Sequence, residues 1–369
     1  MTPARSRAPR GQLSRACVAA CLFAVKGAAS PSLAEMQQRV AAASQSSPPW
    51  DGPRSGPAGV PGKAIAILAE DLRNGGILGV AQGIQEAAKV MRWEVKVFDA
   101  GGTRSGRDTA AAKAVASRPA GLILVGSDAK EMQPRLVPFA QRGIPIVGWH
   151  VGPKAGPMAD CLVATNVSTD PLEVARVTAM AAVVASKGRA GVVIFTDSNF
   201  RIAMAKSEAM AEVIRACEQC TLLEVRDVAI SKSAQLMPTE VRALLARYGR
   251  RWTHALAIND LTFDYAIPEL IKAGDNGLSL LSAGDGSAAA FLRLRARVFQ
   301  TGTVAEPLNL HGWQLVDELN RLLAHQPASG FVIPVHLVTS ENITSDGGPR
   351  LLYDPDNGYR DIYRRIWMR

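Results

Sequence analysis

The sequence predicts an α/β protein with two doubly wound parallel-sheet lobes, on the evidence of two patterns. Short, continuously apolar segments alternate with segments of helical length from residue 63 onward. Strands that are apolar along their whole length are typical of a parallel sheet that helices cover on both faces. The alternation restarts near Asp170, and 369 residues are more than one core usually carries. We therefore expect two similar units rather than one large sheet.

The elements of the first unit follow from this alternation. Strands are expected at residues 64–69, 95–98, 122–125 and 146–149, with helices at 76–90, 106–117 and 130–141. The second unit opens with a helix start at Asp170, because Asp is a good N-cap, Pro171 fits the first turn and Glu173 lies three residues after the cap. Its later strands are expected at 192–195, 221–229, 255–258, 278–283, 298–304 and 331–338, with helices near 201–216 and 235–248.

The first 62 residues differ in character from these units. Four arginines precede an apolar stretch at residues 16–25, and small residues at 32–34 offer a cleavage site. This layout is typical of a secretory signal peptide, so we expect residues 1–34 to be removed on export. Residues 35–62 are rich in Pro, Gly and Ser and are expected to form an extended leader over the surface, anchored by Trp50.

The net charge is less informative than it looks. The chain carries a formal charge of +9, but the first 34 residues hold five basic side chains and no acidic one, which leaves 42 − 5 − 33 = +4 for the rest. A charge of +4 over 335 residues does not indicate a nucleic-acid surface.

Cys217 and Cys220 form a C-x-x-C pair. Zinc needs four ligands, and the sequence has no second C-x-x-C or H-x₃-H pair to complete a site. The pair ends a predicted helix, whereas a thioredoxin-type pair begins one. We expect a local disulfide in an oxidising compartment, with a redox role as the alternative.

Candidate ligand-binding residues follow the strands, because ligands of doubly wound sheets bind beyond the carboxyl ends of the strands. The polar and aromatic residues there are Asp71, Asn74, Asp128, Trp149, His150, Asp197, Asn199, Asn259 and Asp285. Carboxylates and amides suit a polyhydroxylated ligand, and Trp149 would cover its apolar C–H face. Helix capping is the competing interpretation for Asp128, Asp197 and Asp260.

Enzymatic interpretations have less support. The sequence has no G-x-S-x-G, Walker A, H-E-x-x-H or G-x-G-x-x-G pattern, and its five histidines lack metal-ligand spacing. We therefore expect no catalytic residues, no cofactor and no metal. A small-molecule enzyme with Asp285 or His150 as a base is the weaker alternative.

Four segments in this order and spacing resemble the type I periplasmic solute-binding proteins of ABC importers, close to the ribose- and galactose-type sugar binders. They are Ala257-Ile-Asn-Asp260, Ala283-Gly-Asp-Gly286, Thr303-Val-Ala-Glu-Pro307 and Ile144-Pro-Ile-Val147, within a resemblance that covers about residues 63–340. The segments around Trp50 and at residues 353–361 look like features of an uncharacterised subgroup.

The resemblance implies roles for several residues. Asn74, Asn259 and Asp285 match polar contacts to sugar hydroxyls, and Glu306 stands where the ribose pattern has Gln. This sequence departs from that pattern at three places. Gly76 and Ile77 replace paired aromatics, His150 and Val151 replace an Asp-Arg pair, and Met204 replaces an arginine, with Lys206 nearby. The ligand is therefore expected to be a sugar or polyol other than ribose.

The family fold also implies a three-strand hinge. We expect crossovers near residues 164–168, 306–308 and 336–339, an N-terminal lobe of 63–165 plus 307–336, and a C-terminal lobe of 166–306 plus 337–369. The implied protein is a monomer in the periplasm that passes its ligand to an ABC transporter permease in the inner membrane. The alternative partner is a chemotaxis or sensor-kinase ectodomain, and a lac-repressor-type regulator is disfavoured because residues 1–62 carry no helix-turn-helix pattern.

Overall fold

The computed structural model describes residue 1 and residues 31–45, 49–274, 277–347 and 350–369. Residues 2–30 of the predicted signal peptide lie outside this described part. Among the described residues, no helix combines the length and the apolar character that a membrane span requires.

The first lobe is built on a six-stranded sheet in the order β2-β1-β3-β4-β6-β5. Its strands are β1 (Ala64–Ala69), β2 (Glu94–Asp99), β3 (Gly121–Val125), β4 (Ile146–Trp149), β5 (Gly156–Pro157) and β6 (Thr165–Val167). The pairings are parallel except for the antiparallel edge strand β5. Helices α3 (Arg104–Ala116) and α4 (Ala129–Ala140) cover one face of the sheet, and α2 (Gly75–Val90) and α10 (Leu308–Leu323) cover the other. Alternate strand residues such as Ile67 and Leu68 fill the two cores.

The second lobe repeats this design with the strand order β12-β11-β10-β9-β7-β8. Its strands are β7 (Gly191–Thr196), β8 (Thr221–Asp227), β9 (His254–Ala257), β10 (Ser279–Ser282), β11 (Gln300–Ala305) and the antiparallel β12 (His336–Thr339). Its helices are α5 (Pro171–Ala185), α6 (Arg201–Ala216), α7 (Ser233–Tyr248), α8 (Leu261–Ala273), α9 (Ala288–Ala296) and the short α11 (Ile343–Asp346). Short 3₁₀ turns, η1 (Ile230–Lys232) and η2 (Gly249–Arg251), flank α7.

The two predicted doubly wound units are thus confirmed, and most predicted elements fall within a few residues of the observed ones. Asp170 caps α5 as expected, with its Oδ1 accepting from Leu172 N at 2.9 Å. The strand predicted at 331–338 is shorter and spans only His336–Thr339. Cys217 and Cys220 are joined by a disulfide at the end of α6.

The leader is only partly extended, which differs from the prediction. Helix α1 (Leu33–Ala43) begins at a capping box between Ser32 and Glu35, and it buries Met36 and Ala43 against the second lobe. The predicted cleavage site after Ala34 falls inside this helix. The chain then reaches the first lobe, where Trp50 is 4% exposed and packs on Phe331 with ring centroids 5.1 Å apart. The predicted anchoring role of Trp50 agrees with this burial.

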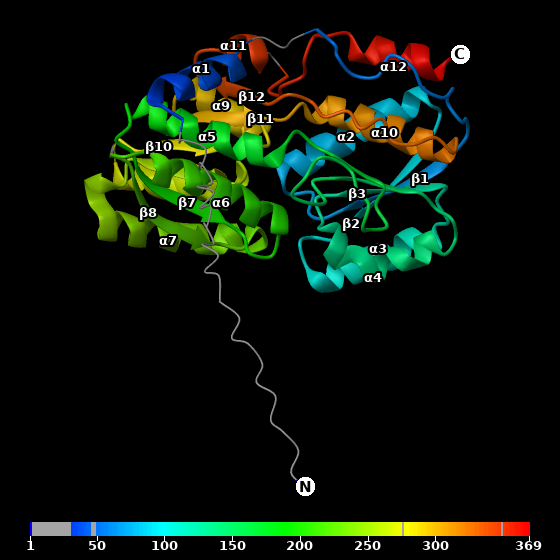
Figure 1. The fold of residues 1–369 in the computed structure, drawn as a ribbon, viewed down its shortest axis with the longest axis horizontal. Helices are drawn as coiled ribbons and strands as arrows, with labels where there is room; N and C mark the ends of the chain where they lie inside the picture. The colour runs from blue at the N-terminus through cyan, green and yellow to red at the C-terminus, as the bar shows by residue number, and fades with distance from the viewer. Residues whose placement is uncertain (2–30, 46–48, 275–276, 348–349) are drawn as a thin grey trace. The chain divides into compact units, whose positions relative to one another are not determined.

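The C-terminal segment also departs from the prediction, which placed all of residues 337–369 with the second lobe. Tyr353 belongs to a second-lobe cluster, but α12 (Tyr359–Trp367) packs on the first-lobe core. Trp367 stacks on Trp313 of α10 with centroids 5.4 Å apart. Figure 1 shows α1 along α5 and α12 beside α10. Both terminal segments therefore add a connection between the lobes, beyond the three that the sheets require.

Candidate ligand-binding site

A cavity of about 570 Å³ lies between the lobes, where the strands of both sheets end. Nine of the eleven predicted ligand-binding residues line it: Asp71, Asn74, Trp149, His150, Asp197, Asn199, Lys206, Asn259 and Asp285. The other two, Asp128 and Glu306, are buried nearby but are not among the lining residues. Most of the predicted ligand-binding residues therefore line one cavity, as expected if ligands bind beyond the carboxyl ends of the strands.

Asp128 has a structural role instead. Its Oδ1 accepts from the backbone N–H groups of Lys130 and Glu131 and so caps α4. Both of its carboxylate oxygens also accept from Arg201 of the second lobe, at 2.7 and 2.9 Å. The helix-capping interpretation is correct for Asp128, and its ion pair connects the two lobes across the cleft.

Glu306 does not line the cavity, but it contacts two histidines, one of which does. Its Oε1 lies 2.7 Å from Nε2 of His150, and its Oε2 lies 3.3 Å from Nδ1 of His311. Burial would raise the pKa of Glu306, but His150, His311 and Lys206 outweigh it and hold that pKa well below its usual value. Burial lowers the pKa of His150, so its imidazole is neutral and donates through Nε2 to the carboxylate.

Trp149 does not offer the open face that the sequence analysis expected. It is 1% exposed and stacks on His150, with ring centroids 3.7 Å apart and 9° between the planes. Its Nε1 donates to Nδ1 of His311 at 3.1 Å. The indole thus touches the cavity while its neighbours occupy its hydrogen-bonding group and one of its faces.

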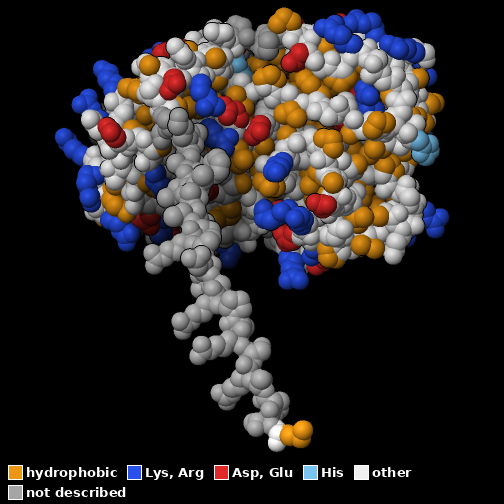
Figure 2. All heavy atoms as spheres, viewed as in Figure 1, with side chains coloured by type: hydrophobic (Ala, Val, Ile, Leu, Met, Phe, Trp, Pro, Cys, Tyr) orange, Lys and Arg blue, Asp and Glu red, His pale blue; other side chains and the backbone are white. Residues whose placement is uncertain are grey.

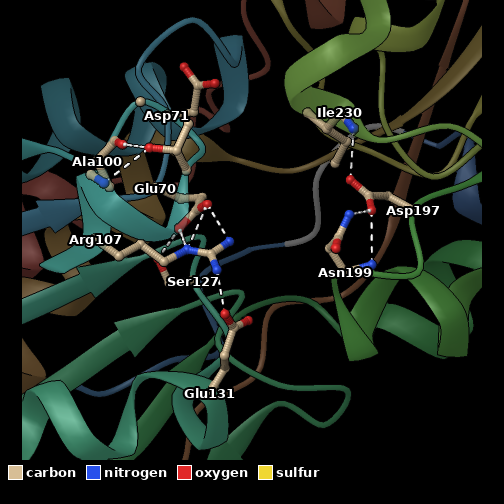
Figure 3. A network of polar contacts seen from close by, with 12 residues as sticks. Glu70, Asp71, Ala100, Arg107, Ser127, Glu131, Asp197, Asn199 and Ile230 are labelled. Atoms are coloured by element: carbon tan, nitrogen blue, oxygen red, sulfur yellow. Dashed lines mark hydrogen bonds and ion pairs between the residues drawn. The ribbon is translucent and has the colours of Figure 1, made fainter. Parts of the chain in front are cut away.

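Many polar groups around the cavity already have partners, and we call these residues the paired network: Glu70, Arg107, Ser127, Glu131, Asp197 and Asn199. Arg107 donates to both oxygens of Glu70, at 2.8 and 2.6 Å, and also binds Glu131. Its hydrogen bond to Glu70 raises the pKa of the Arg107 guanidinium. Figure 3 shows this first-lobe cluster on one side and Asp197 of the second lobe on the other.

In the second lobe, the paired network fixes the loop that carries Ile230 through hydrogen bonds to Asp197. Asp197 accepts from the backbone N–H of Ile230 at 2.7 Å and from Nδ2 of Asn199 at 2.7 Å (Figure 3). It does not cap α6, whose N-cap is Phe200 without a side-chain hydrogen bond. The helix-capping interpretation is therefore wrong for Asp197.

A second group of lining residues keeps unused hydrogen-bonding capacity, and we call it the open set: Asn74, Lys206, Asn259 and Asp285. Within the described part of the chain, no hydrogen bond involves the Asp285 carboxylate, which lies in a residue only 5% exposed. Asn74 and Asn259 use their carbonyl oxygens, leaving both side-chain NH₂ groups without a partner among the described residues. Lys206 donates to Ala283 O at 2.7 Å and has two further N–H bonds to offer.

Asp285 owes its position to Asp260 and to a glycine. The Asp260 carboxylate accepts from the backbone N–H of Asp285 and of Gly286, at 3.0 and 2.8 Å, so it shapes this loop rather than capping α8. Across the cleft, a Cβ on Gly76 would lie 2.5 Å from Asp285 Oδ2. Only glycine therefore lets the carboxylate approach the N-terminus of α2, whose dipole favours a negative charge.

One cation and two other carboxylates, those of Lys206, Glu306 and Asp260, act on Asp285. Burial raises the pKa of Asp285 to about 8, and the Lys206 ammonium opposes this rise. Potential metal-ligand atoms of His150, Asp285 and Glu306 lie within 4.8 Å of one another. Since Lys206 already supplies the positive charge at this cluster, its residues suit a hydroxylated ligand better than a metal ion.

Sequence reasoning missed three charged members of the paired network, Glu70, Arg107 and Glu131. Glu70 follows the first strand and could have been found by the strand-end rule, but Arg107 and Glu131 lie inside the helical segments and carry no such signal. The lining residues Arg104 and Lys232 lie near the starts of α3 and α7. Figure 2 shows acidic and basic side chains on this face, with basic ones gathered at its upper right.

Comparison with known proteins identifies the family. Residues 65–327 match a family model described as a periplasmic binding protein domain. The chain therefore belongs to the periplasmic binding proteins, and its two similar doubly wound lobes are the type I form of that fold. No curated protein matches the sequence.

Solved structures share the fold at low sequence identity. An ABC transporter solute-binding protein from Agrobacterium vitis with bound allitol is 18% identical, with a TM-score of 0.67 over 77% of this chain and 97% of its own. A second from that organism, bound with α-D-tagatopyranose, is 13% identical, with a TM-score of 0.70 over 79% and 99%. One from Bacillus halodurans C-125 with myo-inositol is 16% identical, with a TM-score of 0.63 over 76% and 96%.

Proposed function

We propose that this protein is the substrate-binding component of an ABC importer, which captures a sugar or polyol between its lobes in the periplasm and delivers it to a membrane permease. The observation that carries the proposal is the open set, which brings Asn74 of the first lobe and Lys206, Asn259 and Asp285 of the second lobe to one cavity. Buried polar groups without partners are costly, and ligand hydroxyls satisfy them.

The composition of the cavity favours a neutral ligand. Its lining holds five carboxyl groups and four basic side chains: Glu70, Asp71, Glu131, Asp197 and Asp285, with Arg104, Arg107, Lys206 and Lys232. The near balance of charge gives no strong preference for an anion or a cation. A volume of about 570 Å³ fits a small molecule. The sugars and polyols in the titles of the similar structures support this class of ligand.

Delivery requires that the lobes open and close about their connections. Three crossings join the sheets, at residues 168–170, 306–307 and 332–335; the first lies after and the third before the predicted 164–168 and 336–339, because β6 ends at Val167 and β12 begins at His336. Contacts such as the Arg201–Asp128 ion pair hold the lobes together here. In hinge proteins, a ligand that touches both lobes stabilises the closed form. We propose that the permease recognises this closed form, with the protein acting as a monomer and without catalysis.

A thermal-shift screen of the purified protein tests the proposal. The panel holds pentoses, hexoses, polyols and sugar acids, with nucleotides and NAD as controls. A ligand at about 100 times its Kd stabilises a protein by about 2.7 kcal/mol, which is readily visible. We expect hits among neutral sugars or polyols. Shifts with nucleotides or NAD alone would contradict the proposal.

A further inference from the structure

We infer that the site selects open-chain polyols over pyranose rings, an inference that rests on the proposed function and refines its ligand. The reason lies in how the aromatic side chains around the cavity are used. A pyranose presents a flat apolar C–H face, and proteins commonly cover such a face with the face of an aromatic ring. An open-chain polyol has no such face and is held by its separate hydroxyl groups.

The largest aromatic ring offers no free face to a sugar. Trp149 is 1% exposed, and His150 lies parallel to it at 3.7 Å. The imidazole is fixed in this place by its hydrogen bond to Glu306. The indole N–H is also used, because it donates to His311. A ligand in the cavity therefore meets no open indole face.

The second aromatic ring in the lining is covered as well. The Arg107 guanidinium lies over the ring of Phe200, 5.8 Å from its centroid. Glu70 and Glu131 hold Arg107 there, so a ligand cannot displace the guanidinium without breaking its buried ion pair with Glu70. Phe200 also packs against the apolar core of the second lobe. Phe200 is half-buried, and its contacts connect the lobes and place a cation over one face of the ring.

Position 76 is a third place where an aromatic ring could stack on a ligand, but the residue there is glycine. It stands at the start of α2, and the Asp285 carboxylate fills the space that a side chain would need. An aromatic residue here would collide with Asp285. The neighbouring Ile77 is aliphatic and 5% exposed. At this point the site therefore offers a hydrogen-bond acceptor in place of a stacking surface.

The open set fits a chain of hydroxyl groups. It supplies an acceptor at Asp285 and donors at Asn74, Asn259 and Lys206, from both lobes. An alditol can rotate about each C–C bond and bring its hydroxyls to these groups one by one. A pyranose fixes most of its hydroxyls around a ring, and its apolar face would meet polar groups. An alditol loses torsional freedom when it binds, and this loss lowers its affinity.

Matched pairs of ligands test this inference by isothermal titration calorimetry on the purified protein. Each pair is an alditol and its parent aldose, such as sorbitol with glucose, galactitol with galactose, and xylitol with xylose; allitol is added, and myo-inositol serves as a cyclic polyol. We expect the best alditol to bind at least tenfold more tightly than its parent aldose. Equal or tighter binding of aldoses or myo-inositol would overturn the inference and leave the proposed function intact. No binding by any compound would overturn both.

A variant tests the physical cause. His150→Gly uncovers one face of Trp149, and glycine suits this position because His150 has a φ of 51°. We expect the preference for alditol over aldose to fall at least threefold, with a new change in Trp fluorescence on aldose binding. An unchanged preference in folded His150→Gly would show that the covered indole does not select the ligand, and would overturn this argument.

Discussion

The open set and all of the paired network except Ser127 line the same cavity, yet the two groups differ in how their polar side chains are paired. Arg107 binds two carboxylates, and Asp197 accepts three hydrogen bonds from protein groups. Asp285 is equally buried but has no hydrogen bond to its carboxylate within the described residues. Proximity to a cavity is therefore a poor guide to ligand contact. The better guide is a buried polar group whose partners are missing, because a ligand can supply them.

The largest expected difference between the paired network and the open set is in their contribution to stability. Arg107→Met leaves Glu70, which is 3% exposed, without its cation. Removing one partner of a buried pair costs about 3–5 kcal/mol, so we expect that loss in the free energy of unfolding. Urea denaturation followed by circular dichroism measures it.

Arg135→Met is the matched control, because Arg135 pairs with the exposed Asp108 and should cost about 1 kcal/mol or less. We expect polyol affinity in folded Arg107→Met to change less than threefold. A small loss of stability together with a tenfold loss of affinity would place Arg107 in the ligand contacts and break the comparison.

The next effect is on affinity. Asp285→Asn replaces the unpaired carboxylate with an amide of similar size. A hydrogen bond to a charged group contributes about 1.5–3 kcal/mol, so we expect the Kd of the best-binding polyol to rise at least tenfold at about pH 9, where Asp285 with its pKa of about 8 is ionised. The stability should fall by no more than about 1 kcal/mol, since no hydrogen bond to the carboxylate is lost. Calorimetry with Asp356→Asn, an exposed acidic residue, as the control would detect the difference.

The sequence predicted most residues of this site but not which of them already have hydrogen-bond partners. Asp128 and Asp285 both follow strands; the sequence leaves helix capping open for Asp128, and only the family resemblance singles out Asp285. The structure separates them because Arg201 of the other lobe binds Asp128, whereas Gly76 faces Asp285. Such pairings depend on how two lobes meet, and no local pattern encodes that.

The core elements were predictable because apolar strands and amphipathic helices leave periodic patterns. Helix α12 also has such a pattern, with Tyr359, Ile362, Tyr363 and Ile366 on one face, although no helix was predicted there. What the periodicity cannot give is the lobe on which the helix packs. Its stacking partner Trp313 lies in α10, far back in the sequence. The assignment of residues 359–367 to the second lobe was wrong for this reason.

The third prediction concerns pH and the ionisation of Asp285. Its pKa of about 8 leaves about a tenth of the carboxyl groups ionised at pH 7 and about nine tenths at pH 9. Ligand hydroxyls donate to the ionised form, so binding lowers this pKa and releases a proton. Affinity for a polyol should therefore rise about tenfold between about pH 7 and pH 9 and then level off.

Titration calorimetry across this range, repeated with Asp285→Asn, assigns the dependence to this group. The variant should show a flat profile. Affinity that falls with rising pH in the natural protein would mean that protonated Asp285 donates to the ligand instead, which would contradict the role given to it here.

The smallest effect separates two asparagines that line the same cavity. Asn259 belongs to the open set, and its side-chain NH₂ group has no partner among the described residues. Asn199 belongs to the paired network, and its NH₂ group donates to Asp197. A neutral hydrogen bond contributes about 1 kcal/mol, so Asn259→Ala should weaken polyol binding about fivefold. Asn199→Ala should change affinity less than twofold and should instead loosen the loop that Asp197 holds.

Measuring both variants by calorimetry and by thermal unfolding gives an affinity and a stability for each. Equal losses of affinity would mean that the hydrogen bond to Asp197 does not keep Asn199 from the ligand, and that the division between the two sets does not govern binding.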